Sequence, residues 1–360
     1  MSWNQAKNLL CIRLDTIGDV LMTTPAFRAL KTALPDRRLT LLTSSAGAAI
    51  APLIPEIDQT IVYDSPWLKA TAPRESPRPE YDMIDLLRQH QFDGAIIFTV
   101  YSQNPLPSAF LCYLAEIPLR LAHCHENPYQ LLTDWIKDPE PDRGIRHEVQ
   151  RQLDLVTEIG ATAENQHLSL RVDPRAHDRV SHLLSSFNLP KRWVVMHTGA
   201  TAPSRRYSIE QFAIVADQLI LEHDFAVIFT GTAIELDIVA QIRAKMQATA
   251  HSLVCQLSLG EFAALIELAP VVISNNTAPA HLAAALGTPV VDLYALTNPQ
   301  HTPWQVPHRL LFQDVPCKYC YKSICPEGHH NCLAQVAPET VVKATCELLE
   351  EVTQMLEVSA

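Results

Sequence analysis

Short apolar runs alternate with longer amphipathic segments along most of this chain, and the alternation begins twice. In the first half, apolar runs at 9–14, 39–43 and 94–100 are followed by segments with helical spacing. After the stretch 188–192 (NLPKR), the same order restarts. Strands that alternate with helices predict parallel sheets covered by helices. The sequence therefore predicts an α/β protein with two successive β/α domains, 1–187 and 188–335, followed by a C-terminal helix, 336–360.

Composition places the chain among ordinary globular proteins. A length of 360 residues, with 48% hydrophobic and 19% charged, suits two domains of usual size. The N-terminal stretch lacks the basic segment and apolar core of a signal peptide, and no apolar run reaches the ~18 residues that a spanning helix needs. We therefore expect a cytoplasmic protein. A net charge of −11 argues against general nucleic-acid binding, which depends on clustered Lys and Arg.

The first strand-to-helix turn carries two acids and one glycine within residues 13–25, RLDTIGDVLMTTP. The turn follows a predicted strand, at the end of the sheet where open parallel sheets bind ligands. Asp19 suits two roles there. It is a good helix N-cap, because carboxylates complement the helix dipole, and it has the chemistry of a general base.

Three turns of the second half suit a nucleotide-linked ligand. The loop 197–208 (HTGATAPSRRYS) carries two adjacent arginines, and a guanidinium at a helix start grips a diphosphate. In 230–237 (TGTAIELD), Glu235 is placed to accept both hydroxyls of a ribose. In 274–289 (SNNTAPAHLAAALGTP), a helix of small residues lets its first N–H groups approach a phosphate. The structural alternatives are a solvated loop, a surface acid and a packed core histidine, His281.

Together these turns indicate a nucleotide-linked donor held by the second domain and attacked from the first, across a cleft between the two. A group-transfer enzyme fits this distribution. The dinucleotide motif G-x-G-x-x-G is absent, which argues against a nicotinamide or flavin enzyme.

Four segments resemble the family 9 glycosyltransferases, the lipopolysaccharide heptosyltransferases. They are IRLDTIGDVLMTTPAFRAL at 12–30, HTGATAPSRRYSIEQF at 197–212, TGTAIELD at 230–237 and ISNNTAPAHLAAALGTPVVDLY at 273–294. The resemblance implies a GT-B fold, with two Rossmann-like domains facing a central cleft. It also implies an inverting, metal-independent transfer of heptose from an ADP-sugar to a lipopolysaccharide core. The expected partner is a lipid-linked glycan at the inner face of the cytoplasmic membrane, and the expected state is a monomer.

Residue by residue, the resemblance assigns Asp19 as the general base, in a turn with Gly18 and Arg13 on the acceptor side. Arg205 falls where the family has a Lys or Arg that binds the donor diphosphate. Glu235 matches the ribose-binding acid. The remaining donor-side positions belong to the adenine-contacting turn and the phosphate-contacting helix: Leu257, Ser258, Asn276, Thr277, Ala278 and His281.

This chain departs from the family at that helix start. The family usually reads Ser-x-Asp-Thr-Gly where this chain reads SNNTA at 274–278. Asn276 replaces an acid that approaches the donor, and Ala278 replaces a flexible glycine. An amide both donates and accepts hydrogen bonds and avoids repulsion by two phosphates. We therefore expect Asn276 to alter donor preference, and Asn276→Asp to shift activity toward ADP-heptose.

Four of the nine cysteines crowd into 317–332, CKYCYKSICPEGHHNC. Cys317, Cys320, Cys325 and Cys332 leave three alternatives: a structural metal, reduced thiols packed near the C-terminal helix, or a regulatory disulfide. The spacing of the second pair does not match a standard zinc ribbon. Similar tails occur in part of the resembling family, where catalysis itself does not call for a metal.

Two other functions stay open on the same fold. A nucleotide-sugar epimerase or hydrolase would need further acids or a histidine around the sugar and no acceptor groove. A non-catalytic nucleotide-sugar-binding or metal-binding protein would explain the changes at Asn276 and Ala278.

Overall fold

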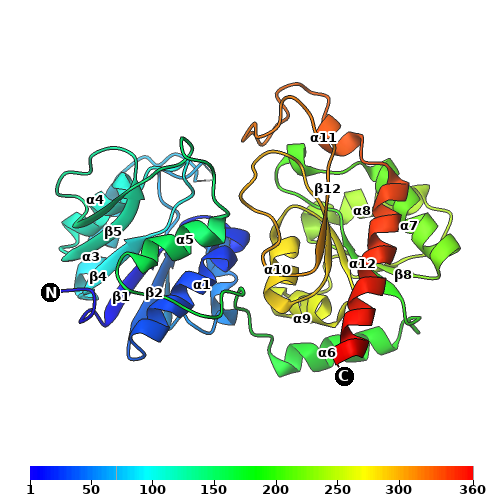
Figure 1. Cartoon of the computed structure of the whole chain (residues 1–360), viewed down its shortest axis with the longest axis horizontal. Coiled ribbons are helices and arrows are strands. Elements are labelled where there is room, and N and C mark those ends of the chain that lie inside the picture. Colours follow the sequence, from blue (N-terminus) through cyan, green and yellow to red (C-terminus); the bar gives the residue numbers. More distant parts are fainter. Residues whose placement is uncertain (70, 360) are drawn as a thin grey trace. The chain divides into compact units, whose positions relative to one another are not determined.

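The computed structural model describes residues 1–69 and 71–359, and the chain divides into two compact units (Figure 1). The units are Met1–Arg171 and Val172–Ala360. The division falls before position 187, where the sequence analysis placed it, because helix α6 (Pro174–Ser185) packs against α9 (Leu259–Leu268) of the second unit. The predicted α/β class is confirmed in both units.

The first unit has a parallel sheet with the strand order β3-β2-β1-β4-β5-β6. Its central strands are buried almost throughout, as expected of a sheet covered on both faces. Helix α1 packs against α5, and α3 packs against α4. The elements are β1 (Asn8–Ile12), α1 (Ile17–Ala33), β2 (Arg38–Thr43), α2 (Ser45–Ala48), β3 (Gln59–Val62), α3 (Arg78–Gln89), β4 (Gly94–Ile97), α4 (Leu106–Leu114), β5 (Leu119–Cys124), β6 (Asp134–Lys137) and α5 (Glu148–Thr157).

The second unit has a parallel sheet with the order β9-β8-β7-β10-β11-β12. The long helix α12, drawn in red in Figure 1, packs against α7. Besides α6 and α9, the elements are β7 (Trp193–His197), α7 (Ile209–His223), β8 (Ala226–Thr230), α8 (Leu236–Lys245), β9 (His251–Ser252), β10 (Val272–Asn275), α10 (Ala278–Leu286), β11 (Val290–Leu293), β12 (His308–Leu311), α11 (Asn331–Ala334) and α12 (Pro338–Ser359).

Both sheets repeat one topology, because each reads third-second-first-fourth-fifth-sixth when its strands are numbered within the unit. In such a sheet the connections diverge between the first and fourth strands, and the loops there leave a crevice for a ligand. The crevice lies between β1 and β4 in the first unit and between β7 and β10 in the second. β1 and β4 end at Ile12 and Ile97, earlier than predicted, so the residues after them belong to these loops.

Asn275 joins the two central strands of the second sheet at this point. Its side chain is fully buried at the end of β10. Its Nδ2 donates to the Thr198 carbonyl at 2.8 Å, and its Oδ1 accepts from the Tyr207 backbone N–H at 3.0 Å. One amide therefore fixes both ends of the loop that follows β7.

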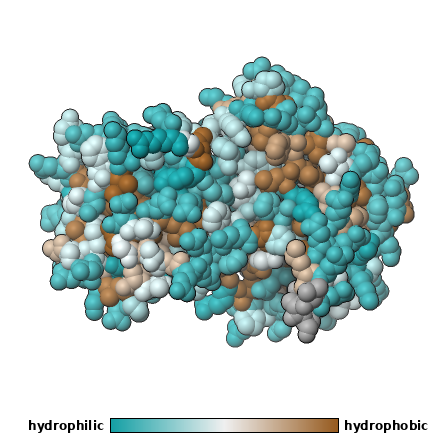
Figure 2. All heavy atoms as spheres, in the orientation of Figure 1, coloured by the Kyte–Doolittle hydropathy of each residue, from teal (hydrophilic) through white to brown (hydrophobic). Residues whose placement is uncertain are grey.

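The surface gives no sign of a membrane-spanning helix. Within the described residues, no helix combines the length and the apolar character needed to cross a bilayer. On the face shown in Figure 2, hydrophilic side chains predominate and hydrophobic ones lie between them, as on most globular proteins.

We predict that Asn275→Ala destabilises the protein by on the order of 2–3 kcal/mol, because it leaves a buried N–H and a buried carbonyl without partners. Urea denaturation would measure the loss. Asn165→Ala is the matched control, since Asn165 is exposed and its side chain accepts only a local bond from the His167 backbone. Equal, small losses in the two variants would contradict the role given to Asn275.

Candidate functional site

A buried arginine organises the loop after β1. The guanidinium of Arg13 has no exposed surface and contacts carboxylates from two regions of the first unit. Its Nε lies 3.1 Å from Asp15 Oδ2, and its Nη2 lies 3.2 Å from Asp19 Oδ1. Its Nη1 lies 2.8 Å from Oε1 of Glu148, in the first turn of α5. Arg13 therefore fixes the positions of the three carboxylates around the turn after β1.

Burial acts against the charges of Arg13, Asp15 and Glu148 in this cluster. Burial would lower the pKa of Arg13, but Glu148, Asp15 and Asp19 raise it above its usual value. Burial raises the pKa of Asp15 to about 6, although Arg13 opposes the rise. Burial likewise raises the pKa of Glu148. Arg13 stays charged at neutral pH, and Asp15 titrates close to neutrality.

Asp19 combines its ion pair with a helix cap. Its Oδ2 accepts hydrogen bonds from the Thr16 backbone N–H at 3.1 Å and from the Thr16 hydroxyl at 2.7 Å. The N-cap of α1 is Thr16, so Asp19 is not the N-cap considered above but caps from the third helical position. These contacts hold the carboxylate in one orientation, one residue after the buried Gly18.

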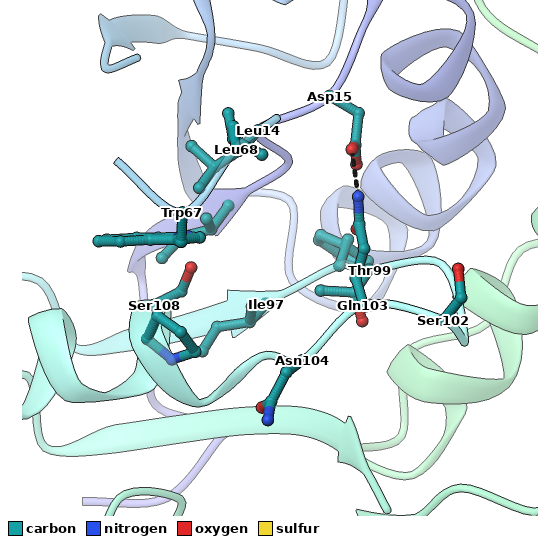
Figure 3. Close-up of a pocket in the computed structure, with 13 residues that line it drawn as sticks. Leu14, Asp15, Trp67, Leu68, Ile97, Thr99, Ser102, Gln103, Asn104 and Ser108 are labelled. Carbon is teal, nitrogen blue, oxygen red and sulfur yellow. Dashed lines mark hydrogen bonds between the residues drawn. The ribbon is translucent and has the colours of Figure 1, made fainter. Parts of the chain in front are cut away.

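Two adjoining cavities open at the end of β1 and share Leu14, Asp15, Leu68 and Gln103 in their walls. Their volumes are about 300 Å³ and 720 Å³. Figure 3 shows the smaller one, with Asp15 directed at Gln103 and Trp67 on the opposite side of the view. Asp15 Oδ1 accepts from Gln103 Nε2 at 2.6 Å.

The lining of these cavities suits a sugar. An indole offers a flat apolar face, and carboxylate, amide and hydroxyl groups bind sugar hydroxyls. The larger cavity adds Ser44, Ser45, Asp64 and Arg74 to the wall. Asp19 lines neither of these two cavities, whereas Asp15 lines both.

In the second unit, the loop after β7 presents an arginine with an unpaired N–H. Arg205 ends the short helix η2 (Pro203–Arg205). Its buried Nε has no hydrogen-bond partner among the described residues. Arg206 differs, because its Nε donates to the Ala200 carbonyl at 2.7 Å. A buried N–H of a cation is costly to leave unpaired, so Arg205 is matched to an added anion.

Glu235 is fixed beside the same loop. Its Oε2 accepts from the Thr232 backbone N–H and hydroxyl, each at 2.7 Å. A Cβ on Gly199 would lie 2.5 Å from the Glu235 side chain, so this approach requires a glycine. Burial lowers the pKa of the adjacent His197 to about 4, although Glu235 opposes it, so that imidazole is neutral at pH 7.

The other predicted donor-side residues lie at two helix starts. Ser258 is the N-cap of α9, and its hydroxyl bonds within that cap next to the half-buried Leu257. Thr277 is the N-cap of α10, and Ala278 is its first residue. His281 is buried in α10. Ser258 and Thr277 therefore have a capping position whether or not a ligand binds.

Asn276 is buried between β10 and α10. Its Nδ2 donates to Asp292 Oδ2 at 2.8 Å and to the His301 carbonyl at 2.9 Å. Asp292 lies in β11 without exposed surface. Burial raises the pKa of Asp292 to about 7, while Asn276 and Arg205 act to lower it. Asn276 and Asp292 therefore lie in the same part of the site as Arg205, which interacts electrostatically with Asp292.

The cysteine segment lies against the arginine loop. The Ser204 backbone N–H donates to the Ser323 carbonyl at 3.1 Å, and its hydroxyl donates to the Lys322 carbonyl at 2.8 Å. Cys317, Cys320, Cys325 and Cys332 line a space of about 20 Å³ as free thiols. Within the described residues, no group of His, Cys, Asp or Glu side chains is arranged to hold a metal. The structural metal thus stays a prediction.

The structure brings some of the predicted residues together in each unit, namely Arg13 with Asp19 in the first, and Arg205 with Asn276, through Asp292, in the second. Sequence reasoning missed members of both. Asp15 was detectable, because it shares the acidic turn with Asp19, and Asp292 was detectable as an acid within the apolar run PVVDLYA. Gln103 and Glu148 carry no such signal, because only tertiary contacts bring them to the end of β1.

Comparisons with known proteins agree on one family. The family model described as Glycosyltransferase family 9 (heptosyltransferase) matches residues 81–355. Lipopolysaccharide heptosyltransferase 2 of Salmonella typhimurium is 25% identical over 362 residues, covering 95% of this chain and 99% of that protein. The glycosyl transferase family 9 structure from Veillonella parvula superposes with a TM-score of 0.80 at 22% identity, covering 98% of each chain. E. coli heptosyltransferase WaaC, solved with ADP-2-deoxy-2-fluoro heptose, gives 0.65 at 18% identity, covering 98% of this chain and 100% of that one.

We predict that stability depends on pH through Asp15. Its folded pKa of about 6 exceeds the unfolded value of about 3.9, so the folded state binds the proton more tightly. As pH rises from about 4 to 7, the wild type should lose on the order of 2 kcal/mol relative to Asp15→Asn. Urea denaturation at the two pH values would measure this. Parallel pH curves for the wild type and Asp15→Asn would contradict it.

Proposed function

The chain belongs to glycosyltransferase family 9, the heptosyltransferases, and from this premise we propose that it moves a heptose or related sugar from an ADP-sugar to a lipopolysaccharide core or similar glycan. We further propose that the transfer inverts the anomeric centre and needs no catalytic metal. The ADP-sugar is supported by the related WaaC, which was solved with an ADP-heptose analogue.

The observation that carries the proposal is the buried, unpartnered Nε of Arg205 at the crevice between β7 and β10. A diphosphate supplies the anion that this N–H lacks, and the first N–H groups of α10 add donors beside it. Glu235 then takes the ribose, and Leu257 and Ser258 face the base. Thr277, Ala278 and His281 complete the phosphate-facing helix.

In the proposed reaction, an acceptor hydroxyl gives its proton to Asp19 as its oxygen bonds to the anomeric carbon. The bond from that carbon to the diphosphate oxygen breaks on the opposite face, and ADP leaves with the electron pair. Arg205 and the helix N–H groups stabilise the charge that ADP gains. Arg13 Nη2, 3.2 Å from Asp19 Oδ1, holds the carboxylate in position before the transfer.

The acceptor glycan is assigned to the two adjoining cavities of the first unit. Trp67 would lie against one sugar ring, and Asp15 and Gln103 would bind hydroxyls at the shared wall. Because such an acceptor is lipid-linked, we propose that the protein works at the inner face of the cytoplasmic membrane, as a monomer.

Arg205→Ala should weaken ADP binding by roughly 10–150-fold, equivalent to the 1.5–3 kcal/mol of a charge-assisted hydrogen bond, and should lower turnover as well. Calorimetry with ADP would measure the affinity. Arg206→Ala is the matched control, because its guanidinium already bonds to a backbone carbonyl. Unchanged ADP affinity in the Arg205 variant would remove this residue from the donor site.

Asp19→Asn should lower turnover by roughly 10²–10⁴-fold with little change in donor affinity, which is the usual effect of losing a positioned general base. Steady-state assays with ADP-heptose and a lipopolysaccharide acceptor would test it. Asp173→Ala removes a cap from α6 in the other unit, so it controls for lost helix stability alone. Near-normal turnover in a less stable Asp19 variant would leave this residue with capping only.

A further inference from the structure

The Asn276 amide is held entirely through its nitrogen. One N–H points to Asp292 Oδ2 at 2.8 Å and the other to the His301 carbonyl at 2.9 Å. A backbone carbonyl only accepts hydrogen bonds, so the nitrogen must face His301. The orientation of the amide is therefore fixed by two acceptors.

This orientation decides what Asn276 offers to a ligand. Both of its N–H groups are used within the unit, and the carbonyl oxygen Oδ1 is the hydrogen-bonding atom that is left. Asn276 thus presents a neutral acceptor, although an amide in general also donates. An aspartate in the same place would set one carboxylate oxygen against the His301 carbonyl and against Asp292, and both contacts are repulsive.

Asp292 interacts with the Arg205 cation as well as with Asn276. It stands in the buried strand β11, pairs with Ser274 of β10 in the sheet, and has no exposed surface. Its Oδ1 has no hydrogen-bond partner within the described residues, so its contact with Asn276 is made by the other oxygen alone. Burying an ionised carboxylate in an apolar strand is costly. When Asp292 is protonated and neutral, its Oδ2 still accepts the hydrogen bond from the Asn276 N–H.

We propose that Asp292 is a positioning residue that, with the His301 carbonyl, turns the Asn276 carbonyl oxygen toward a hydroxyl of the donor sugar. The proposal rests on the proposed function, since it assigns the sugar end of the same donor. The chain then recognises the sugar through an uncharged acceptor, and the buried acid of β11 fixes the orientation of that acceptor.

Calorimetry with ADP-heptose and with ADP separates the sugar contact from the nucleotide contacts. Asn276→Ala and Asp292→Ala should each weaken ADP-heptose binding about tenfold more than they weaken ADP binding. Asp292→Asn retains an oxygen for the Asn276 N–H, so it should keep the wild-type preference. An unchanged ratio of the two affinities in Asp292→Ala would overturn the proposal.

A thermal-unfolding cycle tests the pair even if Asp292→Ala does not fold. Asn276→Asp alone should lower the Tm by roughly 10 °C at pH 8, because two buried carboxylates then face each other. The double variant Asn276→Asp, Asp292→Asn should recover most of that loss, since the amide introduced in β11 would donate to the new acid. Additive losses would overturn the pairing.

The outcome for the wild type separates this proposal from the proposed function. If the wild type binds neither ADP nor ADP-heptose, the proposed function fails. If it binds both with equal affinity, the donor site stands and only the assigned sugar contact fails.

Discussion

Arg13 lies without solvent contact among Asp15, Asp19 and Glu148, and the acceptor side of the protein depends on that arrangement. A buried guanidinium needs acceptors for its N–H groups, and removing one partner of a buried ion pair is strongly destabilising. The same contacts join the turn after β1 to α5 and orient the acid assigned as general base. Stability and proposed chemistry therefore rest on one set of contacts.

In the second unit, buried amide side chains take the place of the ion pairs that fix the turn after β1 in the first unit. Asn275 spans the ends of β7 and β10, and Asn276 is fixed between Asp292 and a backbone carbonyl. Neither amide brings a negative charge to a place assigned to two phosphates. At these two positions the crevice between β7 and β10 therefore carries neutral amides, and Arg205 is a cation whose Nε lacks a hydrogen-bond partner among the described residues.

The periodic features of the sequence predicted the α/β class and the loops that carry Arg205 and Glu235. These features are local, because a strand, a helix cap or an arginine pair is recognised from a few neighbouring residues. Glu148 and Gln103 were missed because their partners lie far along the chain, and Asp292 because its contact with Asn276 forms only in the sheet. Contacts within the chain divide it after Arg171, because α6 packs against α9, and helical periodicity in α6 does not reveal this packing.

The separation of Arg13 and Glu148 along the chain has a consequence for biosynthesis. The two are 135 positions apart, so β1 and α1 leave the ribosome long before α5 is made. Until residue 148 emerges, the nascent chain has an arginine bound for the interior with one of its three acids missing. The acidic turn is therefore translated well before its charge cluster can be completed, and a product truncated before α5 retains the sequence motif without that finished cluster.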